Sequence, residues 1–112
     1  MPLITVKTSG IHIENETKFL NQISNELANL TGKPQSYVMV ILEPNCKIIF
    51  AGEIKPACFI EVKSIGAINP PLMTESFSRI VSDLLKIPMN RIYIAFEDVK
   101  ASQWGFNGKT FG

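Results

Sequence analysis

Apolar and polar residues alternate along the chain in two rhythms, one typical of strands and the other of helices. From Leu3 to Thr8, Ile4 and Val6 fall on one face and Leu3, Thr5 and Lys7 on the other, which predicts a strand. From Asn15 to Thr31 the apolar residues recur three or four positions apart, which predicts an amphipathic helix. Gly32 and Pro34 follow at once and predict its end.

Four further segments continue the pattern. Tyr37 to Glu43 is almost continuously apolar and predicts a strand covered on both faces, as in the centre of a helix-backed sheet. The short run Ile48-Ile49-Phe50 is an edge strand or a hairpin arm. Cys58 to Ile65 alternates and predicts a third main strand. A helix from about Thr74 to Leu85 and a strand from Arg91 to Glu97 complete the series.

The two halves of the chain repeat one spacing. Pro34 precedes Tyr37-Val38-x-Val40, and Pro88 precedes Arg91-Ile92-x-Ile94 at the same distance. We therefore predict an α/β (α+β) fold of two βαβ repeats, in which a four-stranded mixed sheet carries two helices on one face. The helix-free face stays partly bare, and identical subunits are the simplest partner for it.

Composition and charge mainly exclude certain classes of protein and partner. With 112 residues and 46% hydrophobic content, the chain fits one domain spanning residues 1–112. A net charge of +1 argues against nucleic acid or a membrane surface as the main partner. The first residues lack the pattern of a signal peptide and no stretch is long enough for a membrane span, so we expect a soluble cytoplasmic protein.

The conventional catalytic and metal-binding motifs are missing. Cys46 and Cys58 form no CxxC pattern and have no companion histidines, so we expect ordinary buried thiols, no metal site and no cofactor. The single histidine, His12, is expected to be a solvated loop residue. Acidic residues at strand ends are expected to be solvated or paired with basic ones such as Lys55 or Arg91.

Pro2 is the residue whose position points to chemistry. Because initiator methionine is generally removed when the second residue is small, the mature chain is expected to begin with proline, whose nitrogen is then a secondary amine. An α-amino group titrates at about pH 7.7–8.0, and burial or a neighbouring cation lowers this pKa. A neutral amine can act as a general base. The alternative is that Pro2 merely permits methionine removal.

Two further segments are candidates for binding an anionic substrate. Lys33 lies between Gly32 and Pro34 directly after the first predicted helix, although a lysine there also complements the helix dipole. The segment Lys63-Ser64-Ile65-Gly66 ends a strand at a glycine, which can leave backbone N–H groups free for an anion. The alternative for this segment is an ordinary turn.

Five short motifs occur in order over essentially the whole chain. They are Met1-Pro2, Leu30-Thr31-Gly32-Lys33-Pro34, Ser64-Ile65-Gly66, Arg91-Ile92-Tyr93-Ile94 and Asn107-Gly108-Lys109-Thr110-Phe111. Together they resemble the macrophage migration inhibitory factor family of the tautomerase superfamily. The resemblance implies a β-α-β-β-α-β protomer and a homotrimer whose three sheets line a central channel, which would supply the partner of the bare sheet face.

The resemblance also implies an activity that needs no cofactor. Pro2 would be the catalytic base of a keto–enol tautomerase of the phenylpyruvate or dopachrome type, an isomerase that moves a proton between the carbon α to a ketone and its oxygen. Lys33 and the backbone N–H of Ile65 would hold the carboxylate of a small α-keto acid, and Tyr93 of a neighbouring subunit would border the pocket. The implied substrate-binding residues are Lys33, Ser64, Ile65, Tyr93, Ala95 and Phe106.

Departures from the family pattern support a second hypothesis. Ala95 replaces an asparagine that donates a hydrogen bond to aromatic substrates in the best-known members, and Trp104-Gly105-Phe106 replaces an aliphatic-Gly-Trp sequence. A trimeric, cytokine-like interaction protein with a vestigial pocket and a protein receptor is therefore the alternative; such relatives are exported without a signal peptide. Decarboxylation and dehalogenation are a third reading, without a supporting arginine at the motif positions.

Overall fold

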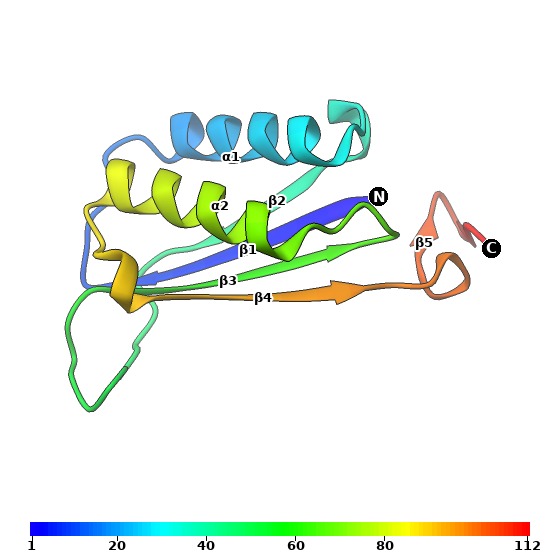
Figure 1. Ribbon diagram of the computed structural model, residues 1–112. Helices are drawn as coiled ribbons and strands as arrows, with labels where there is room; N and C mark the ends of the chain where they lie inside the picture. Colours follow the sequence, from blue (N-terminus) through cyan, green and yellow to red (C-terminus); the bar gives the residue numbers. More distant parts are fainter.

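A four-stranded mixed sheet with two helices on one face forms the body of the molecule (Figure 1). The computed structural model describes residues 1–112. The sheet has the strand order β2-β1-β3-β4. The bounds are β1 Pro2–Ser9, β2 Met39–Glu43, β3 Ala57–Ser64 and β4 Ile92–Asp98. β1 pairs parallel with β2 and antiparallel with β3, and β3 pairs parallel with β4, so the sequence repeat is confirmed as two βαβ units side by side.

The two helices begin and end at residues suited to those places. In α1 (Glu16–Thr31) the Asn15 side chain accepts a hydrogen bond from the Lys18 N–H at 2.9 Å. Gly32 then takes the left-handed conformation, φ 68°, that closes the helix, as its sequence position predicts. Neither helix has the length and apolar character that crossing a lipid bilayer would need.

The second helix, α2 (Pro70–Leu85), is longer than its sequence pattern predicts. It begins four residues before Thr74, because Asn69 caps it and prolines at its first positions need no hydrogen-bond acceptor. Its end comes at Lys86, which adopts a left-handed φ of 60°, so the break precedes Pro88.

The core lies between the helices and the sheet. The buried stripes of α1 and α2 pack on the alternate residues of β1 and β3 that point toward them. Its fully buried large side chains include Ile4, Val6, Ile23, Leu27, Ile60, Val62, Met73, Phe77, Val81 and Ile87. This single layer of packing fixes the register of the strands, because a slip by one residue would turn every apolar side chain away from the helices.

The expectation of a central, doubly covered strand at Tyr37 to Glu43 is wrong for the protomer. Tyr37 belongs to a short 3-10 turn, and β2 lies at the edge of the sheet. Only one face of β2 is covered by the helices, so Met39 remains 58% exposed and Ile41 38% exposed on the other. The helix-free face also carries charged residues, Lys7, Glu61 and Lys63, so it is less apolar than the sequence predicts.

The chain between β2 and β3, residues 44–56, projects beyond the end of the sheet (Figure 1). We call this segment the arm. Ile48-Ile49-Phe50 forms no strand within the protomer. A single bridge joins Phe50 to Glu53 across a turn at Ala51 and Gly52, both with positive φ. The expected ion pairing is only partly present, since Lys55 and Glu53 approach to 2.7 Å whereas Arg91 donates to backbone carbonyl groups instead.

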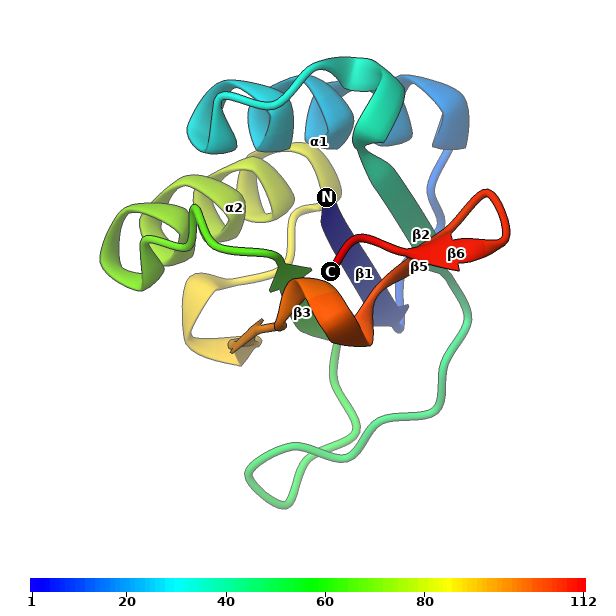
Figure 2. The same ribbon diagram turned by 90° about the vertical axis from the view of Figure 1, so that its right-hand side faces the viewer.

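The C-terminal residues fold back beside the start of the chain. β5 (Gly105–Phe106) and β6 (Lys109–Thr110) form a two-stranded hairpin around Asn107 and Gly108. Figure 2 looks at the molecule from the end where both termini lie, and the hairpin stands there next to β1 and β2. The arm lies at the opposite end of the sheet.

Candidate active site at the start of the first strand

A mostly apolar cavity of about 390 Å³ opens where β1 begins. Pro2 is fully buried at the first position of the strand and forms part of its wall. The remaining wall comes from the turn before β2 and from the C-terminal hairpin. The lining residues are Met1, Pro2, Leu3, Ser36, Tyr37, Val38, Met39, Trp104, Gly105 and Phe106.

The charge of Lys33 acts on the N-terminal amine of the chain, and the N-terminal residue forms part of the wall of this cavity. In the chain that begins with Met1, burial, first, and the positive charge of Lys33, second, lower the pKa of the Met1 amine below its usual value. Lys33 is held in place because Gly32 turns the chain at the end of α1 and the Lys33 N–H donates to Thr31 Oγ1 at 3.4 Å. A cation and an amine with a lowered pKa are therefore neighbours, which favours the neutral, basic form of the amine.

Ser64 lies directly across the sheet from Pro2. The two residues are register partners in the antiparallel β1–β3 pair, and Ser64 is fully buried. Its Oγ has no hydrogen-bond partner, which is unusual for a buried hydroxyl. Ile65 follows at the end of β3, and the next N–H, that of Gly66, donates to Asp98 Oδ1 at 2.9 Å. The structure thus brings the Ser64-Ile65-Gly66 motif to the same strand end as Pro2.

Aromatic side chains form the far wall of the cavity. Phe106 meets Tyr37 edge to face, with ring centroids 6.3 Å apart, and stacks on Phe111 at 5.9 Å. Tyr37, Met39 and Trp104 are cavity residues that the set of site residues chosen from the sequence omits. The sequence feature that could have indicated Tyr37 is the nearby Pro34. Pro34 has an extended backbone after the helix, and the following 3-10 turn brings Tyr37 to the cavity wall that Pro2 also forms.

The structure does not bring Tyr93 and Ala95 to this cavity within one protomer. Both lie on β4 with exposed side chains, and Tyr93 is 65% exposed. Tyr93 instead packs on Phe50 of the arm, with 4.7 Å between the ring centroids. Of the site residues chosen from the sequence, only Pro2 and Phe106 line the cavity. Lys33 acts on the N-terminal amine, Ser64 is the register partner of Pro2 and is followed by Ile65, and the two β4 residues stand apart.

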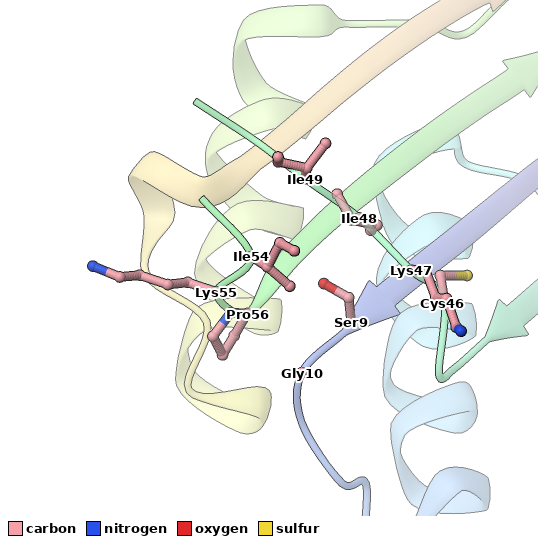
Figure 3. A pocket seen from close by; sticks show the side chains of 9 residues that line it. All are labelled: Ser9, Gly10, Cys46, Lys47, Ile48, Ile49, Ile54, Lys55 and Pro56. Atoms are coloured by element: carbon pink, nitrogen blue, oxygen red, sulfur yellow. The ribbon is translucent and has the colours of Figure 1, made fainter. Parts of the chain in front are cut away.

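A larger cavity of about 630 Å³ lies at the opposite end of the sheet, between the arm and the end of β1 (Figure 3). Its lining contains isoleucines of the arm, two lysines and Cys46, and neither a histidine nor an acidic residue. The neighbouring Cys58 is buried and its pKa is raised to about 12 by burial, with Cys46 as a second cause, so this thiol is unreactive at neutral pH. Cys46 is only half-buried, contrary to expectation. The smaller cavity is therefore the candidate site.

No group of three or more His, Cys, Asp or Glu side chains is arranged to hold a metal ion. The groups next to the start of β1 include the N-terminal amine, the Lys33 charge that acts on it and the buried hydroxyl of Ser64, the register partner of Pro2. This donor set suits proton transfer next to a bound anion.

Comparisons with known proteins identify the family of the chain. A family model described as macrophage migration inhibitory factor matches residues 1–112. The chain belongs to the macrophage migration inhibitory factor family. The macrophage migration inhibitory factor homolog of Brugia malayi is 37% identical, with all of both chains covered, and the Xenopus laevis factor is 31% identical over 99% of each.

Solved structures of the family have the same fold. The homologue from Prochlorococcus marinus superposes with a TM-score of 0.93 at 41% identity, covering 98% of this chain and 99% of the other. The factor from Trichinella spiralis gives a TM-score of 0.91 at 31% identity, covering 97% and 99%. The sequence motifs that resemble this family are thus confirmed as signs of membership.

Proposed function

We propose that the protein is a cofactor-independent keto–enol tautomerase of small α-keto acids, with the amine of Pro2 as general base after removal of Met1. The observation that carries the proposal is the place of the N-terminus at an apolar cavity, where burial and Lys33 lower the pKa of the Met1 amine. Removal of Met1 would put the amine of Pro2, a residue of the same cavity wall, in these surroundings. A neutral amine is the form that accepts a proton. Membership of a family within the tautomerase superfamily supports this assignment.

The residues of the site have distinct roles in the proposed reaction. Lys33 and the backbone N–H of Ile65 bind the carboxylate of the substrate, and the apolar wall around Tyr37 and Phe106 holds its side chain. The nitrogen of Pro2 removes a proton from the carbon α to the ketone. The same proton is then transferred to the ketone oxygen, which gives the enol. The Lys33 charge serves twice, because it binds the anion and keeps the base unprotonated.

We further propose that three copies assemble around their helix-free sheet faces. Met39, Ile41 and Tyr93 remain exposed on that face, and Ile49 and Ile54 are 68% and 85% exposed on the arm. Apolar side chains gathered in this way favour association of subunits. In the trimer Tyr93 of one copy borders the Pro2 cavity of the next, which accounts for its distance from the cavity of its own protomer.

The proposal is tested with purified protein whose intact mass proves a prolyl N-terminus. Such protein is expected to accelerate phenylpyruvate tautomerisation, and Pro2→Gly is expected to lower kcat/KM by about 10²-fold or more, because glycine supplies a different amine without the fixed ring. Pro70→Gly, at the start of α2 and away from the cavity, is the matched control. An unchanged rate in Pro2→Gly contradicts the role of the base.

Ala95 favours one competing candidate, a trimeric interaction protein related to cytokines. Its methyl group offers no hydrogen-bond donor to a substrate. This candidate requires that trimeric, Met1-free protein be inert toward phenylpyruvate and that it bind a protein receptor with the Pro2 cavity chemically blocked. Loss of receptor binding on blocking the cavity would exclude it.

A further inference from the structure

Arg91 is a buried cation without a carboxylate partner. It is 9% exposed and directs its guanidinium into the arm. Nε donates to the Pro56 carbonyl oxygen at 2.8 Å, and Nη1 donates to that of Phe50 at 3.0 Å. Nη2 donates to the carbonyl oxygens of Glu53 at 3.1 Å and Lys55 at 3.2 Å. One side chain therefore fixes four points of the arm backbone through the planar fork that only arginine offers.

The same guanidinium also holds an aromatic ring. Its Cζ lies 5.2 Å from the centroid of the Phe50 ring, within the range of a cation–π contact. The Phe50 ring in turn lies 4.7 Å from the Tyr93 ring at an angle of 46°. Phe50 is thus in contact with Arg91 and with Tyr93, and Tyr93 itself stands on the open face of an edge strand, 65% exposed.

We propose that Arg91 is a positioning residue for Tyr93 and acts through Phe50. The inference rests on the proposed function, in which Tyr93 borders the cavity of a neighbouring copy. A tyrosine on an exposed strand face has several rotamers available, and aromatic contact with a fixed ring selects among them. Arg91 fixes that ring by holding the Phe50 backbone and by contacting its face, so the orientation of Tyr93 depends on Arg91 without any contact between the two being required.

The first experiment reports on the surroundings of the Tyr93 ring. The chain has two tyrosines, Tyr37 and Tyr93, so protein labelled with 3-fluorotyrosine gives two fluorine resonances, which the Tyr93→Phe variant assigns. Arg91→Lys and Phe50→Leu are each expected to shift or broaden the Tyr93 resonance and to leave that of Tyr37 in place. Arg79→Lys, an exposed arginine of α2 paired with Glu75, is the matched control and is expected to change neither.

The two variants probe different parts of the arrangement. Arg91→Lys keeps the charge but loses the planar fork, whereas Phe50→Leu leaves the carbonyl contacts of Arg91 intact and removes only the ring. If Arg91→Lys fails to fold, Phe50→Leu still tests the contact with Tyr93. A Tyr93 resonance that is unmoved in Phe50→Leu overturns the proposal.

The second experiment separates positioning from a merely structural role. In Phe50→Leu we expect KM for phenylpyruvate to rise about 3- to 10-fold, the effect of losing one aromatic contact. The kcat value and the pH dependence of the rate are expected to stay unchanged, because Pro2 and Lys33 are untouched. A fall in kcat at unchanged KM would overturn the proposal.

Failure of this inference and failure of the proposed function give different results. Inactive wild-type protein with a confirmed prolyl N-terminus refutes the tautomerase assignment and with it the kinetic role of Arg91, whereas the fluorine spectra still decide whether Arg91 and Phe50 orient Tyr93. Active wild-type protein with unaltered spectra and unaltered KM in both variants refutes the positioning role alone.

Discussion

At the scale of single residues, the site combines features that differ greatly in how visible they are in the sequence. Pro2 and Lys33 are conspicuous because of their positions, one at the start of the chain and one between a glycine and a proline. Ser64 is named by its motif in the sequence, but its burial, its lack of a hydrogen-bond partner and its place opposite Pro2 are visible only in the fold. Arg91 is the opposite case, because its charge suggests an acidic partner and its actual partners are four backbone carbonyl groups.

Replacing Lys33 by glutamine is expected to alter both binding and pH dependence. The pKa of the N-terminal amine should rise, because the charge that contributes to lowering it is gone, while the larger contribution of burial stays. A smaller fraction of the base is then neutral at a given pH, so the acid limb of the kcat/KM profile moves to higher pH. KM should rise roughly tenfold or more through loss of the charged contact to the carboxylate.

The measurement is a pH–rate profile with phenylpyruvate, together with titration of the ¹⁵N resonance of labelled Pro2. Lys18→Gln provides the control, since Lys18 is exposed at the start of α1. A ¹⁵N titration midpoint that is the same in Lys33→Gln and wild type would show that the two charges do not interact.

At the scale of elements, periodicity predicts which segments are helices and strands. It does not predict properties that depend on neighbouring parts of the structure, such as which faces of a strand are covered. Both helices and all four main strands, in their order, are predicted by the spacing of apolar residues, which is two positions in strands and three to four positions in helices. The centre-strand prediction for residues 37–43 fails because an unbroken apolar run does not say whether a helix or another copy of the chain covers the second face. The sequence pattern places the start of α2 too late. Pro70 and Pro71 suggest a loop, whereas in the structure they are the first residues of the helix and Asn69 caps it.

Removing the cap of α1 is expected to destabilise the fold measurably. Asn15→Ala deletes the acceptor of the Lys18 N–H and should lower the free energy of unfolding by about 1 kcal/mol, or the melting temperature by about 4 °C. Urea unfolding at one fixed protein concentration gives the value. Asn21→Ala, an exposed position inside the same helix, should be neutral or slightly stabilising because alanine is the better helix former. Equal losses in the two variants would mean that the cap contributes nothing specific.

At the scale of the whole molecule, the protomer separates the parts of its proposed site. The start of β1 and the C-terminal hairpin lie at one end of the sheet, while the arm lies at the other (Figure 1). The Pro2 cavity is at the first end, and Phe50 belongs to the arm. Tyr93 sits on the helix-free face in contact with the arm. In the proposed trimer, copies that share their sheet faces would complete the site. The periodicity of one sequence does not show which residues meet across such a boundary.

Assembly is expected to depend on the helix-free face. Wild-type protein should behave as three 12.5 kDa protomers in light scattering coupled to size-exclusion chromatography. Ile41→Lys places a charge on that face and should shift the protein toward monomers, because burying an unpaired ion is strongly unfavourable. Leu72→Lys, on α2 and 48% exposed, is the matched control and should leave the mass unchanged. A fully trimeric Ile41→Lys protein would exclude this face from the interface.

The way in which Arg91 fastens the arm bears on tolerance of acid. Carboxylate ion pairs weaken when their acids become protonated, and the ion pairs of this protein are all exposed surface pairs of that kind. A guanidinium stays charged throughout the accessible pH range, and amide carbonyl groups do not titrate. Arg91, which directly precedes β4, holds the arm through a guanidinium and neutral carbonyl oxygens instead of a carboxylate, so the arm is expected to stay attached in acid that weakens carboxylate ion pairs.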